Sequence, residues 1–102
     1  MAKSKTPYSV IWRPIAETDL DSIIDYIAQD SPARAKKFGQ ELRVKTKPLA
    51  EFPNVGRIGR PGLPDWLREL VVHKDHIIFY RVLDESRSVE ILRAKHAAQQ
   101  MP

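Results

Sequence analysis

His96 is a side chain that could transfer protons next to fixed positive charge. Histidine exchanges protons near neutral pH, and Arg93 and Lys95 lie just before His96 in the chain. A base among cations is an arrangement that acid–base cleavage of a phosphodiester can use. The simpler interpretation is that His96 closes the end of a strand and has a structural role.

The other two histidines do not predict a metal site. His73 and His76 flank the dipeptide Lys74-Asp75, where we expect a turn and solvated side chains, and no third ligand lies nearby in the sequence. The chain has no cysteine, which excludes disulfides, thiolate metal sites and a cysteine nucleophile. We therefore expect neither a metal nor a cofactor.

Length and charge indicate one small domain with a mildly basic surface. The chain has 102 residues and a formal net charge of +4, which suits an acidic protein partner or RNA. It has no long apolar stretch of the kind that spans a membrane, and its first residues lack the apolar core of a signal peptide. We expect a cytoplasmic protein with no membrane contact.

Three short runs rich in β-branched and aromatic residues, at 67–73, 76–82 and 88–93, predict an antiparallel meander that would position these basic side chains. The middle run is apolar on both faces and is therefore expected in the centre of the sheet. Alternation places Ile78, Tyr80 and Val82 on one face and Ile77, Phe79 and Arg81 on the other.

The first half of the chain predicts a strand and two helices. After an expected disordered lead at 1–7, a strand at 8–13 ends at Pro14. An apolar stripe from Ala16 to Ile27 then predicts a helix, and Ser31 with Pro32 predicts the start of another, which Pro48 should interrupt. Residues 17–30 hold five acids and no base, whereas residues 34–47 hold six bases and one acid. We interpret these charges as weakly paired surface residues, with docking of the basic helix on RNA or an acidic protein as the alternative.

The aromatic side chains are expected to have structural roles. Tyr26 and Tyr80 are expected in or near the core, Trp12 against the helical hairpin, and Trp66 over the edge of the sheet. Prolines and glycines crowd 53–66, so we expect a loop without regular structure there. The predicted fold is α+β, with an N-terminal strand and an antiparallel helical hairpin packed on one face of a mostly antiparallel four-stranded sheet. Residues 8–102 would form this single domain.

Several spaced motifs occur in a fixed order along the chain. They are Trp12, Ala16-x-x-Asp19-Leu20-x-x-Ile23-x-x-Tyr26-Ile27, Ser31-Pro32-x-x-Ala35 with Phe38, Pro53-x-x-Gly56-Arg57, Leu67-Arg68-Glu69-Leu70, Ile78-Phe79-Tyr80-Arg81-Val82 and Ile91-Leu92-Arg93-x-x-His96. Together with the order of the elements, this set resembles the RelE/ParE superfamily of toxins from type II toxin–antitoxin modules. The resemblance runs from about Tyr8 to Pro102.

The resemblance implies one of two targets. RelE-like members cut messenger RNA in the ribosomal A site, without a metal, and ParE-like members poison DNA gyrase. Position by position, Arg68 stands where such a nuclease has a lysine, but Leu70 and Ile77 stand where it has basic residues, and no tyrosine follows the last strand. A reduced nuclease site would consist of Arg68, Arg93, Lys95 and His96, with His96 as the base.

The absence of basic residues at Leu70 and Ile77, and of a tyrosine after the last strand, favours the ParE-like branch, because a gyrase inhibitor needs a docking surface and no acid–base pair. We expect that surface on the basic loop and the end of the sheet, at Arg57, Arg60, Arg68, Arg93, Lys95 and His96. The resemblance also implies a plasmid-stabilising function and a cognate antitoxin, whose flexible and often acidic segment would bind in a groove or join a free edge at the first or last strand. A degenerate, non-toxic member that only binds an antitoxin remains the third interpretation.

Overall fold

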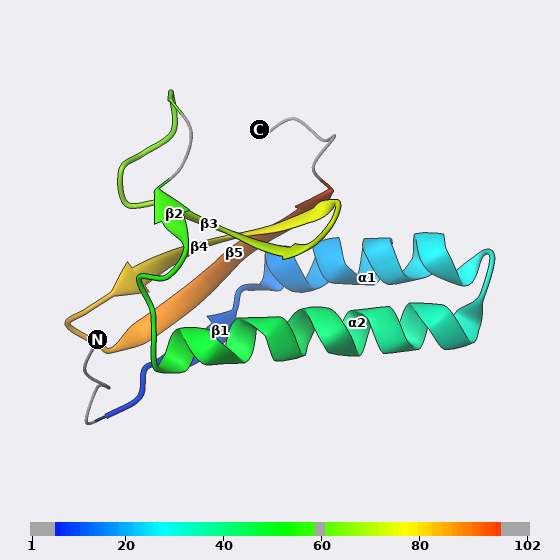
Figure 1. Cartoon of the computed structure of the whole chain (residues 1–102), viewed down its shortest axis with the longest axis horizontal. Coiled ribbons are helices and arrows are strands. Elements are labelled where there is room, and N and C mark those ends of the chain that lie inside the picture. Colours follow the sequence, from blue (N-terminus) through cyan, green and yellow to red (C-terminus); the bar gives the residue numbers. More distant parts are fainter. Residues whose placement is uncertain (1–5, 59–60, 97–102) are drawn as a thin grey trace.

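The computed structural model describes residues 6–58 and 61–96 (Figure 1). Residues 1–5 of the expected disordered lead therefore lie outside the described residues. The elements are β1 (Ser9–Trp12), α1 (Pro14–Ala28), α2 (Pro32–Thr46), the short 3₁₀ helix η1 (Lys47–Ala50), β2 (Arg57–Ile58), β3 (Arg68–His73), β4 (His76–Leu83) and β5 (Ser88–His96). None of the helices in the described part of the chain is long and apolar enough to cross a membrane.

The strands form one sheet in the order β1-β5-β4-β3-β2, with β4 in the centre as predicted. Among the strands of residues 6–58 and 61–96, only the β1–β5 pair is parallel. The sheet has five strands rather than the predicted four, because β2 lies within the stretch that was expected to have no regular structure. Prolines and glycines prevent a long element there, but Arg57 and Ile58 keep the backbone N–H groups that pairing with β3 requires.

The sequence left open whether the first or the last strand is a free edge of the sheet. β1 is an edge strand, as the sequence allowed, whereas β5 lies between β1 and β4 and is not a free edge along Ser88–Ile91. The physical reason is that the last strand, β5, returns to lie beside β1, which precedes the helical hairpin in the chain. Leu92 is an extra residue in β5, because Phe79 pairs with Arg93 while Tyr80 pairs with Ile91. The bulge brings Ala94 onto the helix side of the sheet with Val89 and Ile91.

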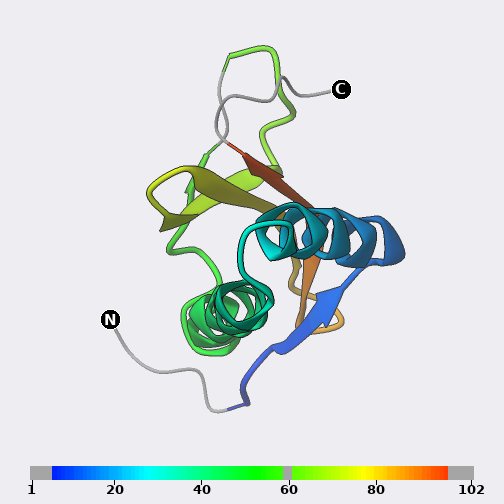
Figure 2. The same cartoon turned by 90° about the vertical axis from the view of Figure 1, so that its right-hand side faces the viewer.

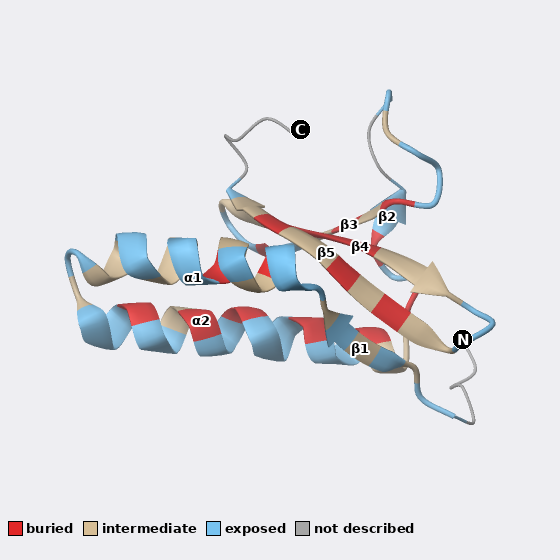
Figure 3. Ribbon diagram, turned by 180° about the vertical axis from the view of Figure 1, so that it is seen from behind, coloured by how far each residue is buried: buried red, intermediate tan, exposed pale blue. Residues whose placement is uncertain are grey.

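The helices cover one face of the sheet and bury the main core against it (Figure 2). That core contains Leu20 of α1, Leu42 of α2, and Ile78 and Tyr80 of β4. A smaller cluster of Leu67, Ile77 and Phe79 lies on the opposite face. Figure 3 shows buried and intermediate residues alternating along β5, whereas β4 is buried at four successive positions. Both faces predicted for β4 are thus confirmed, since a sheet alternates its side chains.

Local sequence signals set the helix boundaries as expected. Pro14 opens α1, and the Ser31 side chain caps α2 by accepting a hydrogen bond from the Arg34 N–H at 3.2 Å. Pro48 ends α2 because its ring cannot continue an α-helix, and the chain passes into η1. The segregated charges pair across the hairpin, where Arg43 binds Glu17. This contact supports the interpretation as weakly paired surface charge.

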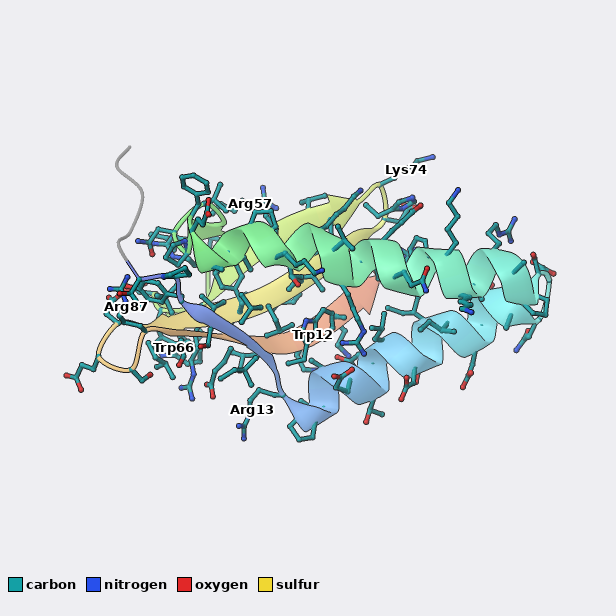
Figure 4. All side chains as sticks on the ribbon, turned by 90° about the horizontal axis from the view of Figure 1, so that it is seen from below. Trp12, Arg13, Arg57, Trp66, Lys74 and Arg87 are labelled. Carbon is teal, nitrogen blue, oxygen red and sulfur yellow. The ribbon has the colours of Figure 1, made fainter. Side chains whose placement is uncertain are left out.

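The hairpin is longer than the sheet that it covers. In Figures 1 and 4 the two helices extend past the turn between β3 and β4. Tyr26, which was expected in or near the core, lies on this overhanging part of α1 and is 75% exposed. The prediction for Tyr26 is therefore wrong, because helical periodicity fixes the face of a residue but not where the opposing sheet ends.

Candidate functional site

Tyr80 holds the basic loop in place from inside the protein. Its buried hydroxyl donates a hydrogen bond to the carbonyl of Pro53 and accepts one from the N–H of Gly56, both at 2.8 Å. A side chain at Gly56 would collide with this contact, since its Cβ would lie 2.5 Å from the Tyr80 oxygen. Burial raises the pKa of the Tyr80 phenol, although the Gly56 bond and the charge of Arg68 oppose that rise. The phenol is therefore neutral at physiological pH and keeps its proton for Pro53.

Arg68 ties the same loop from β3. One guanidinium nitrogen donates to the Gly56 carbonyl at 2.7 Å and to the Asn54 carbonyl at 3.3 Å. A guanidinium that serves two backbone acceptors is held in a fixed position. Arg68 is thus a positioning residue for the loop.

Arg57 presents its charge outward from the loop. Its guanidinium lies 3.3 Å from Glu69, and its side chain is 65% exposed whereas that of Glu69 is fully buried. The large apolar side chains of Val55, Ile58 and Trp66 are also exposed. We call Val55, Arg57, Ile58 and Trp66 the loop surface. Trp66 was expected over the edge of the sheet. Its ring also contacts the central strand, because the guanidinium of Arg81 on β4 lies 5.7 Å from the ring centre.

Arg93 joins β5 to α1 through Asp19. The Asp19 carboxylate accepts hydrogen bonds from Arg93 Nε at 2.7 Å, from Arg93 Nη2 at 3.0 Å and from the Ala94 N–H at 3.0 Å. Burial works to raise the pKa of Asp19, but the bonds from Arg93 and Ala94 and the charge of Arg93 outweigh it and hold that pKa below its usual range. Asp19 in turn raises the pKa of Arg93. These mutual bonds give Arg93 a structural role.

All three histidines meet at the other end of the sheet. The His76 ring centre lies 5.0 Å from that of Phe38, 5.2 Å from that of His96 and 5.9 Å from that of His73. His76 was expected to be solvated, but it is half-buried because the tight turn at Lys74-Asp75 places it against Phe38 of α2. Its burial, together with the nearby His96 and His73, lowers the pKa of His76. Within the described residues, no group of histidine and carboxylate side chains has the geometry of a metal site.

The residues predicted for the functional surface fall into separate places. Arg57 and Arg68 are neighbours on β2 and β3, Arg93 is bound by Asp19, and Lys95 and His96 lie at the end of β5. Arg60 lies outside the described residues. The strand β4 separates Arg68 from Lys95 and His96. Sequence reasoning did not assign Asp19 or Tyr80 a part in positioning the candidate site, because each acts through a partner distant in the sequence.

The comparisons with known proteins agree with this architecture. A family model described as "ParE toxin of type II toxin-antitoxin system, parDE" matches residues 10–101. Toxin RelE2 of Caulobacter vibrioides is 40% identical over 90 residues, which cover 88% of this chain and 96% of that protein. Putative toxin Y4kP of Sinorhizobium fredii is 40% identical over 92 residues, 89% of this chain and 90% of that protein.

Two solved structures share the fold. The chromosomal ParDE toxin–antitoxin system from P. aeruginosa matches with a TM-score of 0.73 and 31% identity over 87% of this chain and 95% of that chain. The toxin–antitoxin complex RelBE2 from Mycobacterium tuberculosis has a TM-score of 0.64 and 24% identity over 96% of this chain and 100% of that chain, a likeness of fold alone. Since the family model spans nearly the whole domain and agrees with these relatives, the chain belongs to the ParE toxin family, within the RelE/ParE superfamily of type II toxin–antitoxin toxins.

Proposed function

We propose that this type II toxin acts on DNA gyrase as a non-enzymatic inhibitor. The observation that carries the proposal is that the arginines nearest to a nuclease arrangement are already engaged within the fold. Arg68 is bonded to two loop carbonyls and Arg93 to Asp19. A cation committed in this way cannot turn toward a phosphorane without breaking the contacts that position a loop or a helix.

The remaining basic groups support the same conclusion. Metal-free RNA cleavage needs a base, an acid and cations that converge on one phosphate. Lys95 and His96 are on β5, on the far side of β4 from Arg68. The buried phenol of Tyr80 is held between Pro53 and Gly56 and faces the loop. These side chains therefore do not converge on one phosphate.

The loop surface has the composition of a protein-docking site. The loop surface exposes Trp66, Ile58 and Val55 as well as Arg57. Aromatic residues and arginine are the side chains that dominate binding energy at protein interfaces. Figure 4 shows Arg57 well away from Lys74 at the far end of the sheet. Among the six basic positions, we propose Arg57 and Arg60 as the residues that touch gyrase, with Arg68 holding their loop and Arg93, Lys95 and His96 outside the contact.

The experiment compares gyrase and ribosome directly. The purified toxin is mixed with gyrase and relaxed plasmid, and separately with ribosomes carrying a defined message. We expect loss of supercoiling or accumulation of cleaved DNA, with the message intact. Arg57→Ala should weaken the effect on gyrase. Arg34→Ala serves as the charge-matched control, because Arg34 is exposed on α2 and its side chain is paired, in the contacts described, only with Asp30 of the turn before that helix.

A ribosome-dependent ribonuclease is the second candidate, because the relative from Caulobacter vibrioides bears the name Toxin RelE2. Message cut in the A site with unchanged supercoiling would establish that function and overturn ours. Neither effect, combined with binding of an antitoxin, would identify a non-toxic member.

A further inference from the structure

The second helix carries lysines whose charges are not matched within the fold. Residues 34–47 hold six bases and one acid. Two of the bases, Arg34 and Arg43, are paired with carboxylates. The other four are exposed and form no ion pair among the described residues, and we call them the lysine surface: Lys36, Lys37, Lys45 and Lys47. Pairing of surface charge across the hairpin therefore accounts for the arginines of α2 but not for the lysines.

The lysine surface has a length that suits the phosphates of a nucleic-acid duplex. A helix rises about 1.5 Å per residue, so Lys37 and Lys45 are about 12 Å apart along the axis of α2, and Lys36 and Lys47 about 16 Å. Double-stranded DNA carries one phosphate charge per about 1.7 Å of its axis, so about 16 Å of duplex carries roughly nine phosphates. Each of the four lysines therefore has a phosphate within the same length of duplex.

The residue types of this surface fit a phosphate backbone better than a protein partner. Lysine is depleted at protein interfaces, where aromatic residues and arginine dominate the binding energy. The single aromatic residue of α2, Phe38, is half-buried against the rings of His73 and His76. Proteins that bind unpaired RNA bases stack them on exposed aromatic rings. A lysine surface without such a ring therefore fits the backbone of a duplex.

The lysine surface lies on the same side of the molecule as the loop surface. α2 packs against β3, whereas α1 packs against β5. Figure 4 shows Arg57 and Lys74 on the α2 side and Arg13 on the opposite side. On α1, Asp21 and Asp25 are exposed and belong to none of the ion pairs of the described residues. A polyanion is therefore attracted to the α2 side of the hairpin and repelled by the α1 side.

We propose that the lysine surface binds the phosphate backbone of duplex DNA, and that this DNA is the duplex on which gyrase acts. The contact is electrostatic and carries no base sequence. The toxin would then hold gyrase through the loop surface and the DNA through α2, and two linked contacts bind more tightly than one. The identity of the DNA rests on the gyrase function proposed above, whereas binding of a duplex by the toxin alone does not.

The first test measures binding of the purified toxin to a short fluorescein-labelled DNA duplex by fluorescence anisotropy at several salt concentrations. Lys37→Gln combined with Lys45→Gln removes two charges from the lysine surface. Each lost phosphate contact lowers the slope of log K against log salt by about 0.9, so the slope should fall by about two and the affinity at low salt by about tenfold or more. Arg13→Gln combined with Lys95→Gln removes two charges elsewhere and should change the affinity less than about threefold. Thermal melting shows whether each variant is folded.

Glu41 provides a variant that should bind more tightly. It is the one acid of residues 34–47, it is exposed, and it lies one helical turn from both Lys37 and Lys45. Glu41→Gln removes a charge that repels phosphate, so the affinity for the duplex should rise about threefold or more at low salt. Asp25→Asn makes the same change of charge on α1 and should have a clearly smaller effect. A gain of affinity has the further merit that misfolding does not produce it.

Three results of this test would overturn the proposal. They are no binding of the duplex at low salt, equal losses in the double lysine variant and its control, and equal gains for Glu41→Gln and Asp25→Asn. Tighter binding of an RNA duplex or of an acidic peptide than of the DNA duplex would also overturn it, because α2 would then serve a different partner.

The second test asks whether the DNA is that of gyrase. The toxin is titrated with gyrase alone and with gyrase bound to a linear duplex, and the wild type should bind the DNA complex about tenfold or more tightly than gyrase alone. The double lysine variant should lose most of this difference and keep the affinity for gyrase alone, whereas Arg57→Ala should weaken binding to both. Equal affinity of the wild type for the two forms would contradict the assignment of the DNA to gyrase. Binding to neither form would refute the proposed function, while the first test decides the DNA contact separately.

Discussion

Replacing Tyr80 by phenylalanine removes one oxygen atom and tests how the basic loop is held. In the wild type that oxygen serves two buried backbone groups, the N–H of Gly56 and the carbonyl of Pro53. Tyr80→Phe leaves both without this partner while the aromatic ring stays in the core. An unsatisfied buried polar group costs about 1–3 kcal/mol. The two groups together should lower the free energy of unfolding by about 2–3 kcal/mol, because relaxation of the loop toward water recovers part of the cost.

The magnitude is large for a domain of this size. Total stabilities of small domains are about 5–15 kcal/mol, and each 1 kcal/mol shifts the melting temperature of a domain of up to about 100 residues by roughly 4–8 °C. We therefore expect a melting temperature about 10–20 °C lower for Tyr80→Phe. Urea unfolding followed by circular dichroism measures the free energy, with an unchanged denaturant slope if the native state is otherwise intact.

Tyr8→Phe is the matched control, because the Tyr8 hydroxyl donates to Asp84 at 2.7 Å on the exposed surface. The same chemical change there should cost less than about 1 kcal/mol, since water replaces the lost partner. Hydrogen exchange at the Gly56 amide should accelerate in Tyr80→Phe and not in the control. Equal losses of stability in the two variants, or an unchanged Gly56 exchange rate, would refute the assignment of Tyr80 as the anchor of the loop.

Three further predictions follow from the same contacts. Gly56→Ala should destabilise the protein by about 1–3 kcal/mol by urea unfolding, because its Cβ would lie 2.5 Å from the Tyr80 oxygen and 2.7 Å from the backbone oxygen of Glu69. An unchanged free energy of unfolding would contradict this close packing. Asp19→Asn should lower stability at pH 7 by about 1–3 kcal/mol through loss of the ion pair with Arg93. Folding lowers the pKa of Asp19. The extra stability of the wild type over Asp19→Asn should therefore disappear as the pH falls below about 4 and through the folded pKa. A stability difference between the two proteins that does not shrink in acid would be evidence against the ion pair of Asp19 with Arg93. The pKa of His76 is also lowered by folding, so the wild type should lose stability as the pH falls below about 6.5, the usual pKa of histidine, toward the folded pKa, and His76→Gln should flatten that part of the curve.

The sequence determined the parts of the fold that depend on local periodicity and chain stops. The stripe from Ala16 to Ile27 fixed the buried face of α1, Ser31 and Pro32 fixed the start of α2, and the doubly apolar run at 76–82 fixed the central strand. Such signals are local, because the geometry of a helix, a cap or a strand is set by residues within a few positions of each other. The ordered motifs added the family, which the family model supports over residues 10–101.

The tertiary structure alone decided which charged and polar side chains are free to act. Arg93 and Arg68 resemble surface cations in the sequence, but one is bound by Asp19, 74 positions away, and the other by the carbonyl of Gly56, 12 positions away. Likewise, sequence periodicity does not show that α1 extends beyond the end of the sheet and leaves Tyr26 exposed. It also does not show that three histidines from three strands lie together near Phe38. These facts depend on register and on the relative lengths of packed elements, which are set by contacts between residues far apart in the chain.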